Sequence, residues 1–135
     1  MPIALEIVSP EKLLLARPVD MAVIPGSEGD MGVMEGHTPM IVMLRGGVIA
    51  LYQGEQVTDR LYVSGGFAEV TPERCTVLAT EALPVAEIKR DTAERLVAEA
   101  QAAYLAADKT TNESEELAQD RVQAAQAMLE AIAGV

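Results

Sequence analysis

The sequence predicts a mainly β plus α fold, in which a β-sandwich or barrel precedes a helical hairpin. All seven prolines and nine of the ten glycines lie at or before Pro84, whereas alanine is frequent after it. Before Pro84, short β-branched runs alternate with turn residues, as is typical of an all-β domain. After Pro84, apolar residues recur at helical spacing. We therefore expect a β-sandwich domain at 1–84 and a two-helix hairpin at 85–135.

The β domain is expected to contain seven or more short strands. Each is a run rich in apolar and β-branched residues bounded by Gly, Pro or polar residues. The chain has one Phe and no Trp. The core must therefore be built from Val, Ile, Leu and Met. The expected strands are Ile3–Val8, Val19–Ile24, Met40–Leu44, Val48–Tyr52, Arg60–Val63, Phe67–Val70 and Cys75–Ala79.

Turn residues separate several of these strands. Gln53-Gly54 and Thr71-Pro72-Glu73-Arg74 each stand between two apolar runs, which predicts hairpins at both places. Ser64-Gly65-Gly66 lies between Val63 and Phe67, where the two glycines are expected to bend or bulge the chain.

Two helices are expected after Pro84. Asp91-Thr92-Ala93-Glu94 offers an alternative start for the first helix, and the helices are expected to break at Asp108–Asn112, with Asn112 capping the second. So short a break favours an antiparallel hairpin. The predicted apolar faces comprise Ile88, Leu96, Val97, Ala100, Ala103, Tyr104 and Ala107, then Leu117, Arg121, Ala124, Ala125, Met128, Leu129 and Ile132.

The faces of this hairpin are rich in alanine, whose methyl group buries little apolar area. We therefore expect weak docking onto the sandwich. The hairpin is either a moving part or a rigid appendage.

The segment Pro25–Pro39 carries four glycines and three carboxylates within fifteen residues. The glycines predict a loop that folds back on itself, either as ordinary turns or as a shaped acidic surface. The acids Glu28, Asp30 and Glu35 lack the spacing of a calcium-binding EF-hand loop. His37 could act as a proton shuttle, but a lone His in a turn more often bonds the backbone or a neighbouring chain.

Composition limits the function classes. The net charge of -11 disfavours nucleic acid and anionic lipid as partners. A lone Cys75 within an apolar run predicts a buried thiol and fits a reducing compartment. Neither a basic leader nor an apolar run long enough to cross a bilayer stands in the sequence, so we expect a soluble intracellular chain.

The sequence offers few of the residues that catalysis requires. One His, one Cys and no repeated ligand spacing disfavour a metal site or a nucleophile with its base, so we expect no catalytic residue, metal or cofactor. Ser64-Gly65-Gly66 is not a nucleophile elbow, because Gly-x-Ser-x-Gly requires a glycine where Tyr62 stands. The alternatives kept open are a subunit of a larger complex, a free-standing β-sandwich binding module and, least favoured, a small enzyme.

Four ordered motifs resemble the epsilon subunit family of the bacterial rotary ATP synthase, the counterpart of the mitochondrial delta subunit. The resemblance covers nearly the whole chain. It implies a β-sandwich of about ten strands, a C-terminal helical hairpin and no catalysis. The motifs are Gly26-Ser27-Glu28-Gly29-Asp30-Met31-Gly32-Val33, Gly36-His37-Thr38-Pro39, Val63-Ser64-Gly65-Gly66-Phe67-Ala68-Glu69-Val70 and Thr76-Val77-Leu78-Ala79.

The resemblance implies a non-catalytic rotor subunit that couples ion flow through the c-ring to ATP synthesis. The sandwich would bind the gamma subunit and the c-ring at the cytoplasmic face of the bacterial inner membrane. By position in the motif, Asp30 would face the polar loops of the ring and His37 would lie close to gamma. Glu28 and Met31 of the same segment are further partner-binding candidates.

The hairpin carries two further implications of the resemblance. In some members it extends toward the alpha and beta subunits and blocks ATP hydrolysis, which suits weak docking, although Arg121 is the only base of the second helix. Some members also bind ATP through Ile-Asp-x-x-Arg-Ala. Here Glu87 and Arg90 remain, but Asp91 replaces the final Ala and repels phosphate, so we expect Glu87 and Arg90 to be solvated residues of a first turn.

Overall fold

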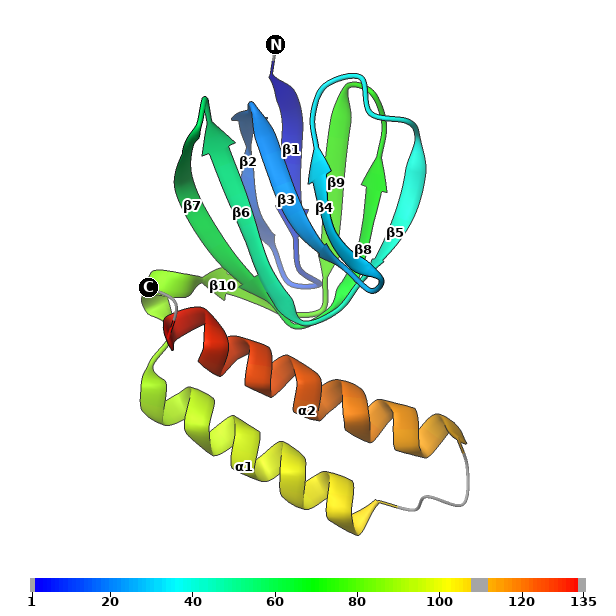
Figure 1. The fold of residues 1–135 in the computed structure, drawn as a ribbon, viewed down its shortest axis with the longest axis vertical. Coiled ribbons are helices and arrows are strands. Elements are labelled where there is room, and N and C mark those ends of the chain that lie inside the picture. The colour runs from blue at the N-terminus through cyan, green and yellow to red at the C-terminus, as the bar shows by residue number, and fades with distance from the viewer. Residues whose placement is uncertain (1, 108–111, 134–135) are drawn as a thin grey trace.

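The computed structural model describes residues 2–107 and 112–133, and it contains ten strands followed by two helices (Figure 1). A short 3-10 helix, η1 (Val85–Glu87), joins the two parts. The helices are α1 (Arg90–Ala106) and α2 (Asn112–Ala133). The strands are β1 (Ile3–Val8), β2 (Leu13–Val19), β3 (Met21–Gly26), β4 (Gly29–Val33), β5 (Met40–Leu44), β6 (Gly47–Gln53), β7 (Gln56–Val63), β8 (Gly66–Val70), β9 (Arg74–Ala79) and β10 (Ala82–Pro84).

The strands form two layers that face each other (Figure 1). The hydrogen-bonded order is β10-β7-β6-β3-β5-β8-β9-β1-β2, with β4 added to β3. The path passes from one layer to the other between β3 and β5, which share a single register pair, Gly26 with Leu44. Across the opposite side, the Arg17 guanidinium of β2 pairs with the Asp59 carboxylate of β7. The predicted β-sandwich with a C-terminal helical hairpin is thus confirmed.

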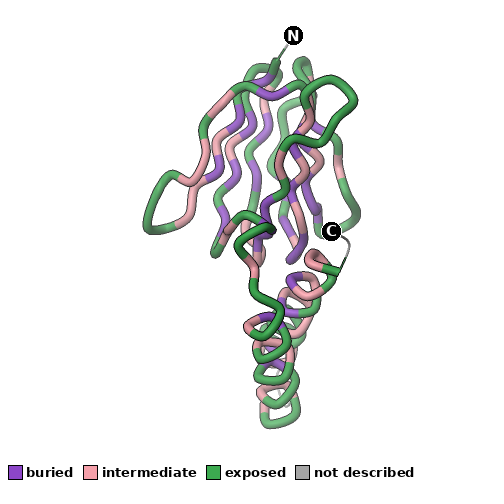
Figure 2. Tube along the Cα trace, turned by 90° about the vertical axis from the view of Figure 1, so that its left-hand side faces the viewer, coloured by how far each residue is buried: buried purple, intermediate pink, exposed green. Residues whose placement is uncertain are grey.

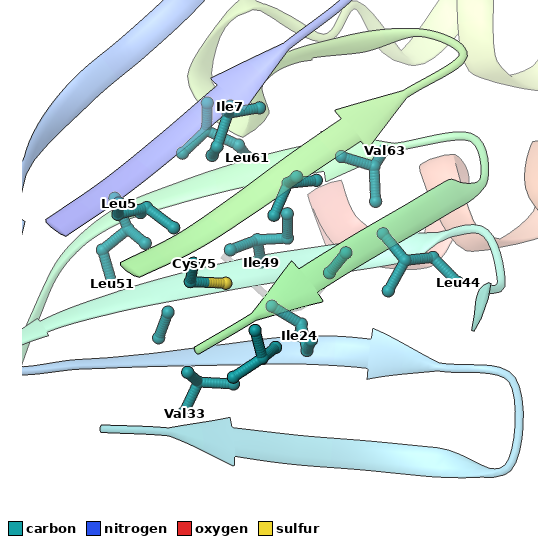
Figure 3. Packing of buried hydrophobic residues seen from close by; sticks show 14 of the residues in the cluster. Leu5, Ile7, Ile24, Val33, Leu44, Ile49, Leu51, Leu61, Val63 and Cys75 are labelled. Atoms are coloured by element: carbon teal, nitrogen blue, oxygen red, sulfur yellow. The ribbon is translucent and has the colours of Figure 1, made fainter. Parts of the chain in front are cut away.

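The core lies between the two layers and follows the alternation of each strand. Ile3, Leu5 and Ile7 of β1 are at most 1% exposed, as expected for every second residue of a strand that faces a core. Figure 3 shows Leu5 beside Leu51 of β6 and Ile7 beside Leu61 of β7. Cys75 also faces the core, so burial raises the pKa of its thiol to about 11.

The segment Pro25–Pro39, which was expected to be a loop that folds back on itself, does fold back, but much of it is strand. Strand β3 extends to Gly26, and β4 covers Gly29–Val33, so only a short turn and the segment 34–39 lack strand structure. In β4 the pairs Ala22–Val33 and Ile24–Met31 align apolar residues across the hairpin, and Val33 is fully buried. Those apolar pairs outweigh the low strand propensity of the intervening glycines.

Two further strands were not among those expected from the residues alone. Leu13–Val19 forms β2, and the expected strand at Val19–Ile24 is displaced, because β3 begins at Met21. Leu13-Leu14-Leu15-Ala16 has helical propensity, but pairing with β1 overrides it. The short strand β10 pairs with the end of β7. The predicted turns at Gln53-Gly54 and Thr71–Arg74 are confirmed as the links β6–β7 and β8–β9.

The hairpin follows the prediction with three corrections. Ile88 is not part of the first helix, since its backbone is extended between η1 and α1. Helix α1 begins at Arg90, after Lys89, which makes no side-chain capping bond, so Asp91 lies inside the first turn instead of capping it. Leu117 faces solvent and is 61% exposed. The predicted break at Asp108–Asn112 falls largely outside the described residues, as does the side chain of Asn112.

Helix α2 lies between α1 and one end of the sandwich (Figure 1). Exposed residues cover much of the hairpin surface (Figure 2), and its buried side chains include Ala93, Ala100, Ala125 and Met128. A second apolar cluster joins the hairpin to the outer face of the β6–β7–β10 layer. It contains Tyr62, Val85, Ala93 and Met128, with Val48, Leu83, Ile88, Leu96, Ala127, Leu129, Ala131 and Ile132 packed around them.

Candidate partner-binding site

The outer face of the layer that contains β5, β8 and β9 carries apolar side chains that neither of the described helices covers. We call this surface the β5–β9 patch and define it by Ile41, Met43, Phe67 and Leu78, which are 68%, 60%, 38% and 37% exposed. Register places Met43 beside Phe67 and Phe67 beside Leu78, so these three form one row across three strands. Exposed apolar side chains that adjoin one another in this way are typical of interaction surfaces.

Reasoning from the sequence missed this patch, although β5 carries a signal for it. Met40–Leu44 is an uninterrupted apolar run, whereas a strand with one solvated face alternates apolar and polar residues. In the structure Val42 and Leu44 face the core, and Ile41 and Met43 face outward. Such a run predicts that both faces of the strand are covered, but nothing in residues 2–107 and 112–133 covers the outer face of β5.

Two of the predicted binding residues, Glu28 and Asp30, lie on the β3–β4 tip, which we define as residues 27–30. Both are exposed. The Asp30 carboxylate is already engaged, since the Arg45 guanidinium Nη2 donates to its Oδ1 at 2.6 Å. With side chains 63% and 40% exposed, this is a surface ion pair of modest strength. Asp30 can therefore exchange Arg45 for an external cation at little cost.

The other two predicted residues lie elsewhere. Met31 is on β4, and its side chain packs partly against the sandwich core, which leaves less of it for a partner. His37 lies in the segment 34–39, at the opposite end of β4 from the β3–β4 tip (Figure 1). Its Nδ1 is 2.8 Å from the Thr38 carbonyl oxygen, so the ring bonds the backbone, as expected for a lone turn His. The structure thus separates His37 from Asp30.

The remaining candidates do not assemble into a site. Glu87 and Arg90 are exposed, and the nearest acid to the Arg90 guanidinium is Glu94, four residues further along α1, at 3.7 Å. Arg90 is a solvated residue of the first turn of α1, whereas Glu87 lies before that helix, in η1. Ser64 precedes Gly65 and Gly66, whose φ values of 140° and 129° mark a bend. The Ser64 N–H donates to the carbonyl oxygen of Glu81, which lies between β9 and β10, at 3.1 Å.

Metal binding and membrane crossing find no support in the described part of the chain. Among residues 2–107 and 112–133, no three His, Cys, Asp or Glu side chains lie close enough to hold a metal ion. Neither of the described α-helices has the combination of length and apolar character that crossing a bilayer requires.

Comparison with known proteins identifies the fold and its relatives. Residues 2–85 match the family described as ATP synthase, Delta/Epsilon chain, beta-sandwich domain. An ATP synthase epsilon chain of Granulibacter bethesdensis is 62% identical over 128 residues, which cover 95% of both chains. An ATP synthase epsilon chain of Gluconacetobacter diazotrophicus is 47% identical over 134 residues, with 99% of this chain and 95% of the relative covered.

Solved structures agree with these relatives. A chain in the Euglena gracilis mitochondrial ATP synthase, OSCP/F1/c-ring in rotational state 1, matches with a TM-score of 0.76 and 25% identity, over 97% of this chain and 81% of that one. A chain in the Tetrahymena thermophila mitochondrial ATP synthase central stalk and c-ring has the same fold, with a TM-score of 0.69 and 12% identity over 98% and 97%. The chain therefore belongs to the delta/epsilon family of ATP synthase subunits, as a non-catalytic epsilon chain of the central stalk.

Proposed function

We propose that the β5–β9 patch binds the gamma subunit, so that the sandwich turns with the central stalk. The observation that carries the proposal is the uncovered apolar row of Met43, Phe67 and Leu78. Burying large apolar side chains contributes about 1.5–3 kcal/mol each, enough for a few of them to dominate an interface. On the other layer the hairpin already packs over the outward-facing Val48, Tyr62 and Leu83, whereas the β5–β9 patch stays exposed.

His37 lies at one end of the patch, because the segment 34–39 leads directly into β5. Met34 and Met40 flank it and are 53% and 40% exposed. Methionine side chains adapt to irregular partner surfaces. This setting supports His37 as a residue at the rim of the gamma interface, while the row of Met43, Phe67 and Leu78 forms its centre.

The gamma contact can be tested with Phe67→Asp and Met43→Asp in the full chain. A buried, unpaired carboxylate at the centre of the interface should weaken gamma binding by about tenfold or more, as measured by calorimetry or co-purification. Val57→Asp is the matched control, because Val57 is 39% exposed on β7, outside the patch. Urea unfolding checks that all three variants keep their stability. Equal gamma affinity for Phe67→Asp and Val57→Asp would rule the patch out.

A second contact is assigned to the β3–β4 tip, which we propose faces the polar loops of the c-ring. Glu28, in the turn, and Asp30, at the start of β4, present exposed carboxylates, and such charges fix orientation more than affinity. Asp30→Lys should therefore weaken the coupling of proton pumping to ATP hydrolysis, measured in membranes with the reassembled synthase. Unchanged pumping in that variant would remove Asp30 from the ring contact.

We further propose a division of labour between the two parts of the chain. The sandwich, residues 1–84, makes the rotor contacts at the cytoplasmic face of the inner membrane. The hairpin, residues 85–135, is assigned to regulation of hydrolysis through the alpha and beta subunits. The exposed Leu105 and Leu117 support the second assignment, because the docked hairpin leaves these apolar side chains uncovered.

A further inference from the structure

The β5–β6 turn, residues 45–47, meets α2 through an unusual pair of hydrogen bonds. The Gly46 N–H donates to the Gln123 side-chain Oε1 at 2.9 Å, and Gln123 Nε2 donates to the Gly46 carbonyl oxygen at 2.7 Å. One carboxamide thus satisfies both backbone groups of one residue, as a neighbouring strand would. Both bonds are partly buried, so water competes with them less than at an open surface.

Glycine is required at position 46 by the closeness of the helix. A Cβ there would lie 2.6 Å from the Ala124 Cα and 3.0 Å from the Ala124 Cβ. The Tyr62 hydroxyl donates to the Ala124 carbonyl oxygen at 2.8 Å. Three hydrogen bonds therefore hold two successive residues of α2, which fixes the position of the helix along the sandwich. This is more specific than the weak, alanine-based docking expected from the sequence.

The other side of the same turn contacts the β3–β4 hairpin. Arg45 bonds the Asp30 carboxylate with its side chain and the Pro25 carbonyl oxygen with its N–H, at 2.6 and 3.0 Å. A Cβ at Gly47 would lie 2.7 Å from the Pro25 Cβ and 3.3 Å from Arg45 Nη1. The turn is therefore held between the β3–β4 hairpin on one side and α2 on the other.

We propose that the β5–β6 turn is a latch for the helical hairpin, in which Gly46 seats Gln123 and Ala124 while Asp30 sets the turn through Arg45. A cationic partner that takes Asp30 from Arg45 thereby weakens the docking of α2. Coupling of this kind requires the partner to bind the chain more tightly when the hairpin is released than when it is docked. Competition with Arg45 for the Asp30 carboxylate supplies that difference in affinity. Only the identity of the cationic partner as the c-ring rests on the proposed function.

The contact of Gly46 with Gln123 and Ala124 can be tested in the full chain by measuring the open-to-docked ratio. This is the ratio of chains whose hairpin has left the sandwich to chains whose hairpin is packed against it. Spin labels at Glu55→Cys and Glu116→Cys report the distance between the far end of the sandwich and α2. Loss of two hydrogen bonds in Gln123→Ala should raise the ratio roughly tenfold. Gln126→Ala is the matched control, since Gln126 is an exposed glutamine of the same helix. Equal open-to-docked ratios in the two variants would show that the hydrogen bonds between Gln123 and Gly46 do not hold the hairpin.

A second pair of variants tests the closeness of the backbone. Gly46→Ala should raise the open-to-docked ratio at least as much as Gln123→Ala does, because the added methyl group collides with the α2 backbone. Gly32→Ala is the control, since a Cβ there would meet only the Met21 sulfur, at an ordinary 3.5 Å. Far-UV circular dichroism and urea unfolding confirm that each variant keeps its sandwich. A docked hairpin in Gly46→Ala would contradict the latch.

The coupling to Asp30 is tested separately with trilysine as the cationic probe. Trilysine should raise the open-to-docked ratio of the parent chain several-fold, and Asp30→Asn should abolish that response. Glu28→Gln, which alters the other carboxylate of the tip, should respond like the parent. An identical response in Asp30→Asn would overturn the coupling. These measurements need no synthase, so they are independent of the proton-pumping test of Asp30→Lys.

Discussion

Tyr62→Phe tests the link between sandwich and hairpin with the removal of a single oxygen. Tyr62 is 2% exposed although it points outward from β7, because α2 and η1 cover it. At neutral pH the variant loses one hydrogen bond to the Ala124 carbonyl oxygen, which keeps its place in the helical ladder of α2. The expected cost is about 1 kcal/mol in the free energy of unfolding.

The sign of this difference should reverse at high pH. Burial, and then the nearby charge of Glu81, raise the pKa of Tyr62 from 10.0 to about 12. The folded state therefore holds the phenol proton more tightly than the unfolded state. That stabilisation is intact below pH 10 and is lost between pH 10 and 12, by about 1.4 kcal/mol at pH 11. Phenylalanine has no proton to lose, so the variant should become the more stable chain near pH 11.

Urea unfolding of both chains from pH 8 to pH 11.5 measures this reversal. Cys75, whose pKa burial raises to about 11, also titrates in this range, but both chains carry it and its effect cancels in the difference. A difference that stays constant from pH 8 to pH 11.5 would refute the reasoning, because it would mean that Tyr62 is not shielded by the hairpin.

Two further predictions concern the sandwich. Gly66→Ala should cost about 3 kcal/mol or more in urea unfolding, because φ is 129° and a Cβ would collide with the Leu78 carbonyl oxygen; a cost no larger than that of Gly32→Ala would contradict this. Cys75 should react with thiol reagents at the rate of unfolding, measured by mass spectrometry at pH 8, because it is fully buried and its pKa is about 11. Labelling of the native chain at the rate of a free cysteine would count against the buried thiol.

The residues predicted the architecture well wherever one periodicity dominated. The change from Gly and Pro to Ala at Pro84 separated strands from helices, and alternating runs such as Ile3–Val8 located most strands. The strands β2 and β4 could not be found in this way. Their stability comes from pairing with β1 and β3, which a local pattern of leucines or glycines does not reveal.

The binding surfaces were harder to predict because they depend on what the fold leaves uncovered. The tip residues Glu28 and Asp30 followed from the resemblance, but the partner of Asp30, Arg45, is distant in sequence. The uninterrupted runs in β5 and at the end of β7 carry the missing signal. In β7, Leu61, Tyr62 and Val63 are all buried. This three-residue apolar run indicates that both faces of the strand are covered there, the outer one by the hairpin.

The parallel pairing of β1 with β9 has a consequence for the order of folding. Leu5 pairs with Cys75 and Ile7 with Val77, so the first strand finds one of its two neighbours only near the end of the β domain. During synthesis on a ribosome, β1 and β2 leave the exit tunnel before β9. The edge of β1 that pairs with β9 therefore stays unpaired until β9 has been synthesised. Closing so long a loop is entropically costly and slow compared with forming the local hairpins. We expect the nascent chain to expose an apolar strand edge throughout that interval, which favours aggregation until the sandwich closes.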